Sequence, residues 1–396
     1  MANIGDDPRL LGLLQRARDI NNNGVPRNIS NDVAESIIDG CRDGVAPKSG
    51  ALFIAVGREQ LFLDLRNDLK LVYHGASSLR IINGELGTGK SFLLRVIEEY
   101  AIEHDFATSF ITLSNRECPM HDLTQVYRFI VRNMGIGSKN DTIEDILDKW
   151  AQCLIGKYGA IVEILRLIPD EIKELDHDFL RALTVYFESS KFKKLPEKYL
   201  ALRWIRGETN ISDARNLKVS KNLTENNALS MLGHLTKMLK FLGKGGLVIL
   251  MDEIDTISQI MDPELLEKAF ANTSALSKAY IHTPYSYFAF ATTPAFMNSE
   301  VNRYSESYHN YTDVEYLRNP DLLELSSKIR DLHFRVYGWN NSKVNRRLLW
   351  TFVRNCSLRG ISTTRDFLRL LISRLDYCEE TRSANIENAF SDIRML

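Results

Sequence analysis

The residues from Gly84 to Ser91 have types and a spacing that suit them to holding phosphate. They read G-x-x-x-x-G-K-S, the pattern of a phosphate-binding P-loop. Glycines allow a tight turn with no Cβ in the way, so consecutive backbone N–H groups can point at phosphate oxygens. The ammonium group of Lys90 can reach the β- and γ-phosphates, and the hydroxyl of Ser91 can ligate Mg²⁺. The sequence therefore predicts an ATP·Mg²⁺ site formed by Gly84, Glu85, Leu86, Gly87, Thr88, Gly89, Lys90, Ser91 and Phe92.

The segments on either side of this loop are those that the motif requires. Residues 78–82 form a short apolar run that predicts a buried strand, and residues 92–100 have apolar side chains at helical spacing. A helix that begins near Lys90 would direct the positive end of its dipole at the phosphates. A glycine turn alone could match the pattern by chance, but a strand, a glycine loop and a helix in this order make the match specific.

A second motif, at residues 245–253, predicts the metal and water chemistry. A fully apolar run indicates a central parallel strand buried on both faces, and it ends in Asp252 and Glu253. Open α/β sheets place their ligands at the carboxyl ends of such strands. In this Walker B pattern Asp252 would hold Mg²⁺, mainly through water, and Glu253 would act as general base on the attacking water. The alternative is a buried strand that ends in two carboxylates by chance.

A third strand end supplies a candidate contact with the γ-phosphate. Residues 287–294 predict another apolar strand, which ends in Thr292 and Thr293. A polar side chain at this point can touch the γ-phosphate or the attacking water. The position in the chain favours this interpretation over a plain strand end, and Thr293 is the residue that we assign to the role.

Two arginines are candidates for contacts with the γ-phosphate from further along the chain. Arg365 lies at the expected start of a helix that Ser362 or Thr364 could cap, from which it could point at the nucleotide. Its alternative role is a surface ion pair with Asp366. Arg303 lies in a polar segment and could reach a neighbour's γ-phosphate in a ring or dimer, or it could be solvated.

The composition restricts the class of protein. The chain has 396 residues, 44% hydrophobic and 26% charged, with a net charge of −1, so it has no global basic field and any DNA contact must come from a local patch. No apolar run is long enough to span a membrane, and the N-terminus lacks the apolar core of a signal peptide. We therefore expect a cytoplasmic protein. The scattered cysteines argue against a zinc site and fit a reducing compartment: Cys41, Cys118, Cys153, Cys356 and Cys378.

More residues separate the two nucleotide motifs than a minimal P-loop core needs. The intervening residues 135–241 are helical by pattern, which predicts an insertion that carries partner or substrate contacts. Two short basic segments within it, residues 191–194 and 203–206, each contain an aromatic residue and could either contact nucleic acid or form a solvated face. Residues 56–58 could pack on the adenine, or could form a turn between a strand and a helix.

The order of these segments, closed by a helical lid with an arginine, resembles that of an AAA+ ATPase of the origin-recognition type. A narrower resemblance is to the ATP-binding proteins of BREX phage-defence systems, the BrxD-like P-loop family. The segments of this chain that carry the narrower resemblance are residues 37–47, 55–59, 204–208, 214–219, 227–232, 246–253 and 363–369. This chain has Thr364 where the C-terminal motif more usually has Pro, and Lys218 where Gly is more usual.

The resemblance implies an α/β fold with an AAA+-type P-loop core, a large helical insertion and a C-terminal helical lid. The predicted segments are an N-terminal helical part (1–50), the first part of the core (51–134), the insertion (135–241), the second part of the core (242–320) and the lid (321–396). It also implies bacterial antiviral defence, association with DNA, action beside a helicase or methyltransferase, and homo-oligomers. A nucleotide-gated assembly switch with little hydrolysis is the alternative to an ATPase, and a small-molecule kinase is disfavoured because the Asp-Glu pair suits water activation.

Overall fold

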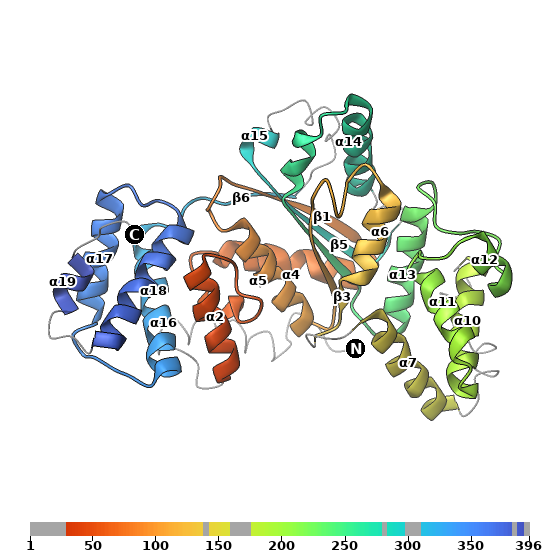
Figure 1. The fold of residues 1–396 in the computed structure, drawn as a ribbon, viewed down its shortest axis with the longest axis horizontal. Helices are drawn as coiled ribbons and strands as arrows, with labels where there is room; N and C mark the ends of the chain where they lie inside the picture. The colour runs from red at the N-terminus through yellow and green to blue at the C-terminus, as the bar shows by residue number, and fades with distance from the viewer. Residues whose placement is uncertain are drawn as a thin grey trace. The chain divides into compact units, whose positions relative to one another are not determined.

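The computed structural model describes residues 29–137, 142–158, 176–278, 283–297, 310–381 and 386–391 (Figure 1). They belong to two compact units. The first unit combines residues 1–65, 83–100 and 313–396 of the chain, and the second combines residues 66–82 and 101–312. Arg303, the first 28 residues of the predicted N-terminal helical part and residues 159–175 of the predicted insertion lie outside the described residues.

Among the described residues, six strands form one sheet in the order β3-β2-β4-β5-β1-β6 (Figure 1). β2 pairs with β4 and β4 with β5 in parallel, whereas β3 is antiparallel to β2. The strands are β1 (Ser77–Asn83), β2 (Ala107–Thr112), β3 (Met134–Gly135), β4 (Leu247–Asp252), β5 (Ser286–Thr292) and β6 (Asn310–Asp313). Every residue of β4 and β5 is buried, as expected for central parallel strands. The predicted α/β core with a mostly parallel sheet is confirmed.

Helices occupy most of the described chain between β3 and β4, as the apolar periodicity predicts. They are α7 (Ile143–Tyr158), α10 (His177–Phe192), α11 (Leu195–Ile205), α12 (Ile211–Leu217) and α13 (Ala228–Phe241). Before β3 and after β4, the helices near the strands are α4 (Glu59–Tyr73), α6 (Leu123–Arg132), the 3-10 helix η2 (Ile254–Gln259), α14 (Pro263–Ser277) and α15 (Pro294–Met297). One apolar cluster contains buried side chains of both the sheet and the inserted helices, for example Ile249 and Phe288 with Phe179, Trp204 and Met238.

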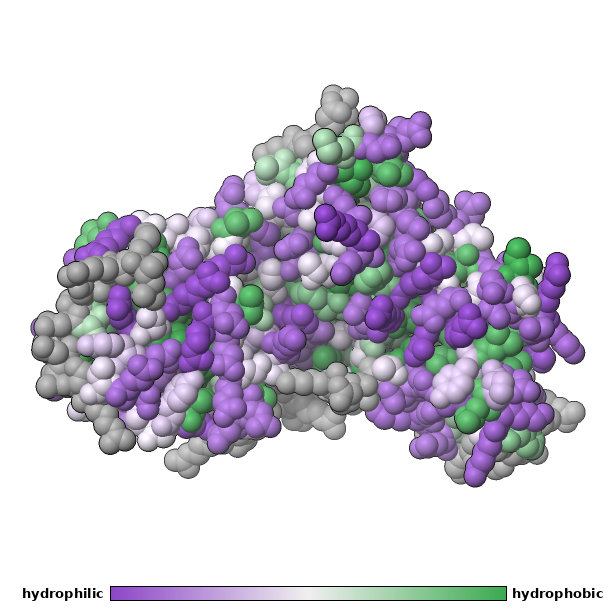
Figure 2. All heavy atoms as spheres, viewed as in Figure 1, coloured by the Kyte–Doolittle hydropathy of each residue, from purple (hydrophilic) through white to green (hydrophobic). Residues whose placement is uncertain are grey.

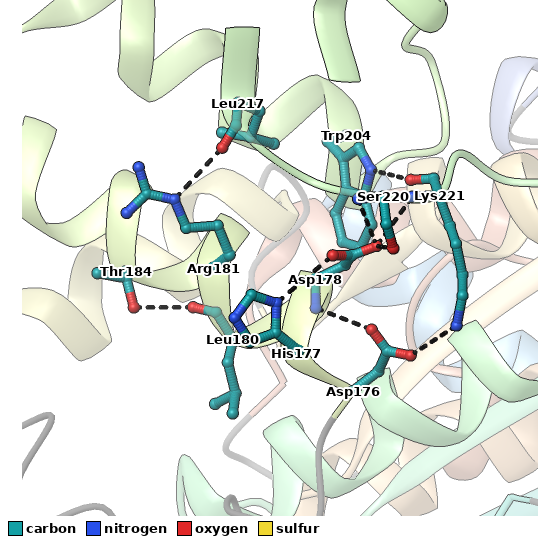
Figure 3. A network of polar contacts seen from close by, with 10 residues as sticks. All are labelled: Asp176, His177, Asp178, Leu180, Arg181, Thr184, Trp204, Leu217, Ser220 and Lys221. Atoms are coloured by element: carbon teal, nitrogen blue, oxygen red, sulfur yellow. Dashed lines mark hydrogen bonds and ion pairs between the residues drawn. The ribbon is translucent and has the colours of Figure 1, made fainter. Parts of the chain in front are cut away.

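A buried carboxylate fixes the loop after α12 to the inserted helices (Figure 3). Asp178, at the start of α10, is 3% exposed and accepts hydrogen bonds from the backbone N–H groups of Ser220 (2.8 Å) and Lys221 (2.9 Å). The Ser220 hydroxyl also donates to it, and the indole N–H of Trp204 donates to the Lys221 carbonyl oxygen. Burial raises the pKa of the Asp178 carboxyl, but these hydrogen bonds lower it by more, so the pKa lies below its ordinary value.

Replacing this carboxylate is expected to loosen the inserted helices. Asp178→Ala leaves two backbone N–H groups and the Ser220 hydroxyl without their acceptor and should reduce the free energy of unfolding by about 3 kcal/mol. Asp176→Ala, which removes the N-cap of α10 and a half-exposed ion pair with Lys221, should cost only about 1 kcal/mol. Because the folded pKa of Asp178 is lowered, its contribution is complete above pH ~4 and is lost as the pH falls through the folded pKa. Chemical denaturation of both variants at neutral and acid pH measures the two losses of unfolding free energy and how they depend on pH. Equal losses for the two variants would contradict the assigned role of Asp178.

The first unit has a core of its own, built from α2 (Asn31–Asp43), α3 (Ala51–Ile54), α16 (Asn319–Tyr337), α17 (Arg346–Leu358), α18 (Thr364–Thr381) and α19 (Ile386–Ser391). Asp376 of α18 accepts hydrogen bonds from Arg42 of α2 and lies 2.8 Å from Nε2 of the buried His333 of α16. The Trp339 indole donates to Nδ1 of His333, so Nε2 carries the proton and donates to Asp376. The helices α16 to α19 confirm the expected helical C-terminal part.

Apolar side chains are largely withdrawn from the surface of both units. In the face that Figure 2 displays, hydrophilic side chains predominate and hydrophobic ones are scattered. Among the described residues, no helix is both long enough and apolar enough to cross a membrane.

Candidate nucleotide-binding site

The loop after β1 has the backbone that phosphate binding requires. Gly87 and Gly89 have φ angles of 82° and 100°, the left-handed region that residues with a Cβ rarely adopt. A Cβ placed on Gly84 would lie 2.6 Å from the Val314 carbonyl oxygen, whereas one placed on Gly89 would meet no atom within 4 Å. The loop is therefore closely packed on one side and open at Gly89. The buried Thr88 stabilises the turn, since its hydroxyl donates to the Glu85 carbonyl oxygen at 2.9 Å.

Lys90 and Ser91 begin the helix that follows the loop, α5 (Lys90–Glu103). The Lys90 ammonium group donates to the carbonyl oxygens of Gly84 (2.7 Å) and Glu85 (3.1 Å), which places its charge over the loop. Ser91 is half-buried, and Phe92 packs against the core of the first unit. Glycines in the left-handed region, an open side and a lysine over the loop together fit the phosphates of a nucleotide.

The start of α18 lies against this loop within the first unit. A Cβ on Gly87 would come within 2.8 Å of the Thr363 side chain, and the Tyr316 hydroxyl donates to the Leu86 carbonyl oxygen at 3.2 Å. Thr363 also caps α18, because its hydroxyl accepts from the Asp366 backbone N–H and donates to the Asp366 carboxylate. Thr363 of the lid and Tyr316, which precedes the lid, therefore lie against the predicted phosphate loop.

The prediction of which residue caps α18 was wrong. Neither Ser362 nor Thr364 provides the cap that Thr363 provides, and the Thr364 hydroxyl is buried without a hydrogen-bond partner. The T-x-x-D pattern from Thr363 to Asp366 was the sequence signal that could have identified it. Arg365 is exposed, and its side chain packs against Gly44, the C-cap of α2.

The segment at residues 56–58 also belongs to the first unit, and it joins two helices instead of a strand and a helix. The Glu99 carboxylate of α5 accepts from the backbone N–H groups of Gly50, Ala51 and Leu52, which holds the short helix α3 in place. Arg58 donates to the Glu315 carbonyl oxygen at 2.9 Å. The turn between strand and helix is therefore not observed, and contact of this segment with adenine stays a prediction.

Asp252 and Glu253 lie in the second unit, at the end of β4. The Asp252 side chain is buried, and one of its oxygens accepts from the Glu253 backbone N–H at 3.0 Å. Glu253 is exposed and has φ 58° and ψ 40°, a left-handed conformation that is uncommon for a residue with a Cβ. Such strain is concentrated at functional sites. The buried strand thus ends in one enclosed and one exposed carboxylate.

The end of β5 brings Thr293 close to the residues that follow Glu253. The Thr293 hydroxyl donates to the carboxylate of Asp255, in η2, at 3.2 Å. The neighbouring Thr292 is 1% exposed, and its hydroxyl has no hydrogen-bond partner. Sequence reasoning missed Asp255, although its position three residues after Asp252 was visible. The predicted site residues Asp252, Glu253 and Thr293 therefore belong to neighbouring strand ends in one unit.

Comparison with known proteins places these features in a family. The structure of the Aeropyrum pernix ORC2 protein, in ADPNP and ADP complexes, is similar to this chain with a TM-score of 0.47 and 12% sequence identity, over 86% of this chain and 69% of that one. A search of curated proteins found no match. The model of the family described as "BREX system ATP-binding protein BrxC/D" matches residues 29–304. Because this match spans well over half of the sequence, the chain belongs to the BREX system ATP-binding protein BrxC/D family.

Proposed function

We propose that this chain is an AAA+-type ATPase of a phage-defence system, which binds ATP with Mg²⁺, hydrolyses it and couples its nucleotide state to DNA or to a partner protein. The observation that carries the proposal is the loop between β1 and α5, with its two left-handed glycines and Lys90 over the loop carbonyls. Membership in a family of ATP-binding proteins supports the same conclusion.

The residues of the candidate site would have separate roles in binding phosphate, holding Mg²⁺ and activating water. Backbone N–H groups of residues 84–92 and the Lys90 ammonium would bind the phosphates. The Ser91 hydroxyl and the Asp252 carboxylate would hold Mg²⁺, which when bound neutralises negative charge on the phosphates. The exposed carboxylate of Glu253 would take the proton of the attacking water. β1, which leads into the P-loop, and β4, which ends in Asp252, belong to the same sheet, with β5 between them, and this supports the joint assignment.

Thr293 and Arg365 would sense the γ-phosphate. Thr293 directly follows β5, and its hydrogen bond to Asp255 would be exchanged for one to the nucleotide or the attacking water. Arg365 lies two residues after Thr363, which contacts Gly87. A small rotation of the start of α18 would therefore change the distance between Arg365 and the phosphates, which makes this arginine a candidate sensor.

The contact between the loop and the lid suggests how nucleotide state would be transmitted. Thr363 and Tyr316 touch the loop at Gly87 and Leu86, so a change in loop conformation on binding or release of the γ-phosphate would act directly on α18. We propose that this motion alters engagement of DNA or of another protein of the defence system, such as a helicase or methyltransferase, and that the chain acts as a homo-oligomer.

The same contact favours a second candidate function, a nucleotide-gated assembly switch. Because the loop touches the lid, occupancy by ATP alone could reposition α18, with slow hydrolysis used only for release. The two functions differ in turnover. A steady-state ATPase assay on the purified chain, titrated with double-stranded DNA, separates them: DNA-stimulated turnover supports the ATPase, whereas ATP-dependent assembly without turnover supports the switch.

A further inference from the structure

Residues 332–365 of the lid contain basic residues but no acidic residue. Between Asp331 and Asp366 the sequence has no acidic residue, although the whole chain has a net charge of −1. The same stretch contains the basic residues Arg335, Lys343, Arg346, Arg347, Arg354, Arg359 and Arg365. Much of it forms α17, which lies among α16, α18 and α19 in Figure 1. The lid therefore has a local positive charge that the net charge of the chain conceals.

The basic residues of α17 lie on its outward face. Arg346, Trp350, Arg354 and Leu358 follow one another at intervals of four residues and are all exposed, Trp350 by 37% and Leu358 by 80%. Arg347 is exposed beside them. The opposite face contains Leu349, Phe352, Val353 and Cys356, each 0% exposed in the core of the first unit. One face of α17 is thus packed in the lid core, and the other is basic and exposed.

In the part of the chain that the structure describes, these charges have no acidic partner. Within the described residues, no carboxylate pairs with Arg346, Arg347 or Arg354, and α17 contains no acidic residue. Arginines of the adjacent α16 differ, since Arg330 pairs with Asp331 and Arg335 donates to the Ile29 carbonyl oxygen. Arginines that have no such partner and are exposed on one helix suit a ligand with closely spaced negative charges.

We propose that the outward face of α17 binds the phosphate backbone of double-stranded DNA. Arg346 and Arg354 are about 12 Å apart along the helix axis. A duplex carries one charge per ~1.7 Å of its axis, so this span covers several phosphates. Arginine recognises phosphate through paired N–H groups, and Trp350 provides apolar contact area between the two arginines. A membrane surface fits less well, because an amphipathic helix binds lipid with its apolar face, and that face of α17 is buried in the core.

A second exposed basic site offers a matched control. At the turn from α10 to α11, Phe192 is 64% exposed and Lys193 and Lys194 are exposed; Lys191 precedes them in the sequence. The acidic Glu197 is exposed in the first turn of α11, so the charge there is mixed. Replacing the three lysines by alanine changes the net charge of the chain by the same amount as replacing the three arginines of α17. Any general effect of charge is therefore the same in the two variants.

The inference rests on the DNA engagement in the proposed function but not on ATP hydrolysis, and its test measures binding alone. The full chain is titrated into a short fluorescein-labelled duplex, and anisotropy is recorded at several salt concentrations, with and without ATP. The variants are Arg346→Ala/Arg347→Ala/Arg354→Ala, Trp350→Ala, and Lys191→Ala/Lys193→Ala/Lys194→Ala. Thermal unfolding and ATP binding are measured for each variant, which separates loss of DNA binding from loss of fold or of the nucleotide site.

The triple arginine variant should bind the duplex roughly 100-fold more weakly, with a salt dependence shallower by about 3 in log–log slope. The triple lysine variant should bind within about 3-fold of the unsubstituted chain, and Trp350→Ala should weaken binding without changing the slope. No binding by the unsubstituted chain, or equal losses in the two triple variants, would overturn the proposal. Binding to an acidic protein of the same defence system that is lost in the arginine variant, with no binding to DNA, would reassign the surface.

Discussion

Lys90→Ala is expected to abolish ATP turnover and to weaken ATP binding by at least ~100-fold. The Lys90 ammonium lies over the phosphate loop, bonded to the carbonyl oxygens of Gly84 and Glu85, and it would exchange these bonds for contacts with the β- and γ-phosphates. Removing one such charged donor from an enclosed site typically costs on the order of 100-fold or more. Calorimetric titration with a non-hydrolysable ATP analogue measures the binding, and phosphate release measures the turnover.

The matched control for this variant is Lys70→Ala, which removes an exposed lysine of α4. It should bind and hydrolyse ATP as the unsubstituted chain does. Since Lys90 is at the first turn of α5 and alanine is a good helix former, the fold should survive the substitution. Unchanged turnover in Lys90→Ala would show that the loop between β1 and α5 is not the nucleotide site.

Glu253→Gln is expected to leave ATP bound while turnover falls by about 100- to 10,000-fold. A carboxamide has nearly the shape of the carboxylate but cannot take a proton from water. The backbone of Glu253 is in the left-handed region, and Gln meets the same strain there as Glu, so the change should be chemical and not conformational. ATP should therefore accumulate on the variant, which single-turnover measurements with labelled ATP would detect.

Glu267→Gln makes the same chemical change on the exposed surface of α14 and should hydrolyse ATP at the unsubstituted rate. If Glu253→Gln also hydrolysed at that rate, the general base would lie elsewhere, and Asp255, which binds Thr293, would be the next residue to replace. Loss of ATP binding in Glu253→Gln would instead indicate that this carboxylate acts in binding.

The parts of the fold that could be predicted from the sequence are those in which one short pattern determines the structure. The apolar run from Leu247 to Met251 is followed by an acidic pair and favours a central strand, and it forms most of β4, in which every residue is buried. The glycine pattern likewise requires a turn, and Gly87 and Gly89 adopt the left-handed angles that make it possible. Both predictions depended on residues adjacent in sequence.

The parts that could not be predicted depend on residues far apart in the chain. The apolar run at residues 51–54 is too short for periodicity to distinguish a helix from a strand, and it is helical because Glu99 binds its backbone N–H groups. The contact of Thr363 with Gly87 likewise joins segments that no local pattern connects. The basic face of α17 was visible in the sequence, but its exposure depended on which side of the helix enters the lid core.

The core that the sheet shares with the inserted helices limits how this protein can be redesigned or shortened. Phe179, Trp204 and Met238 lie in the same apolar cluster as Ile249 and Phe288 of the sheet. An internal deletion of residues 135–241 would therefore remove part of the core that the sheet residues share, and the shortened chain should aggregate instead of retaining a working core. In hydrogen exchange, amides of α13 and β4 should open together in one cooperative step, which a separately folded module would not do.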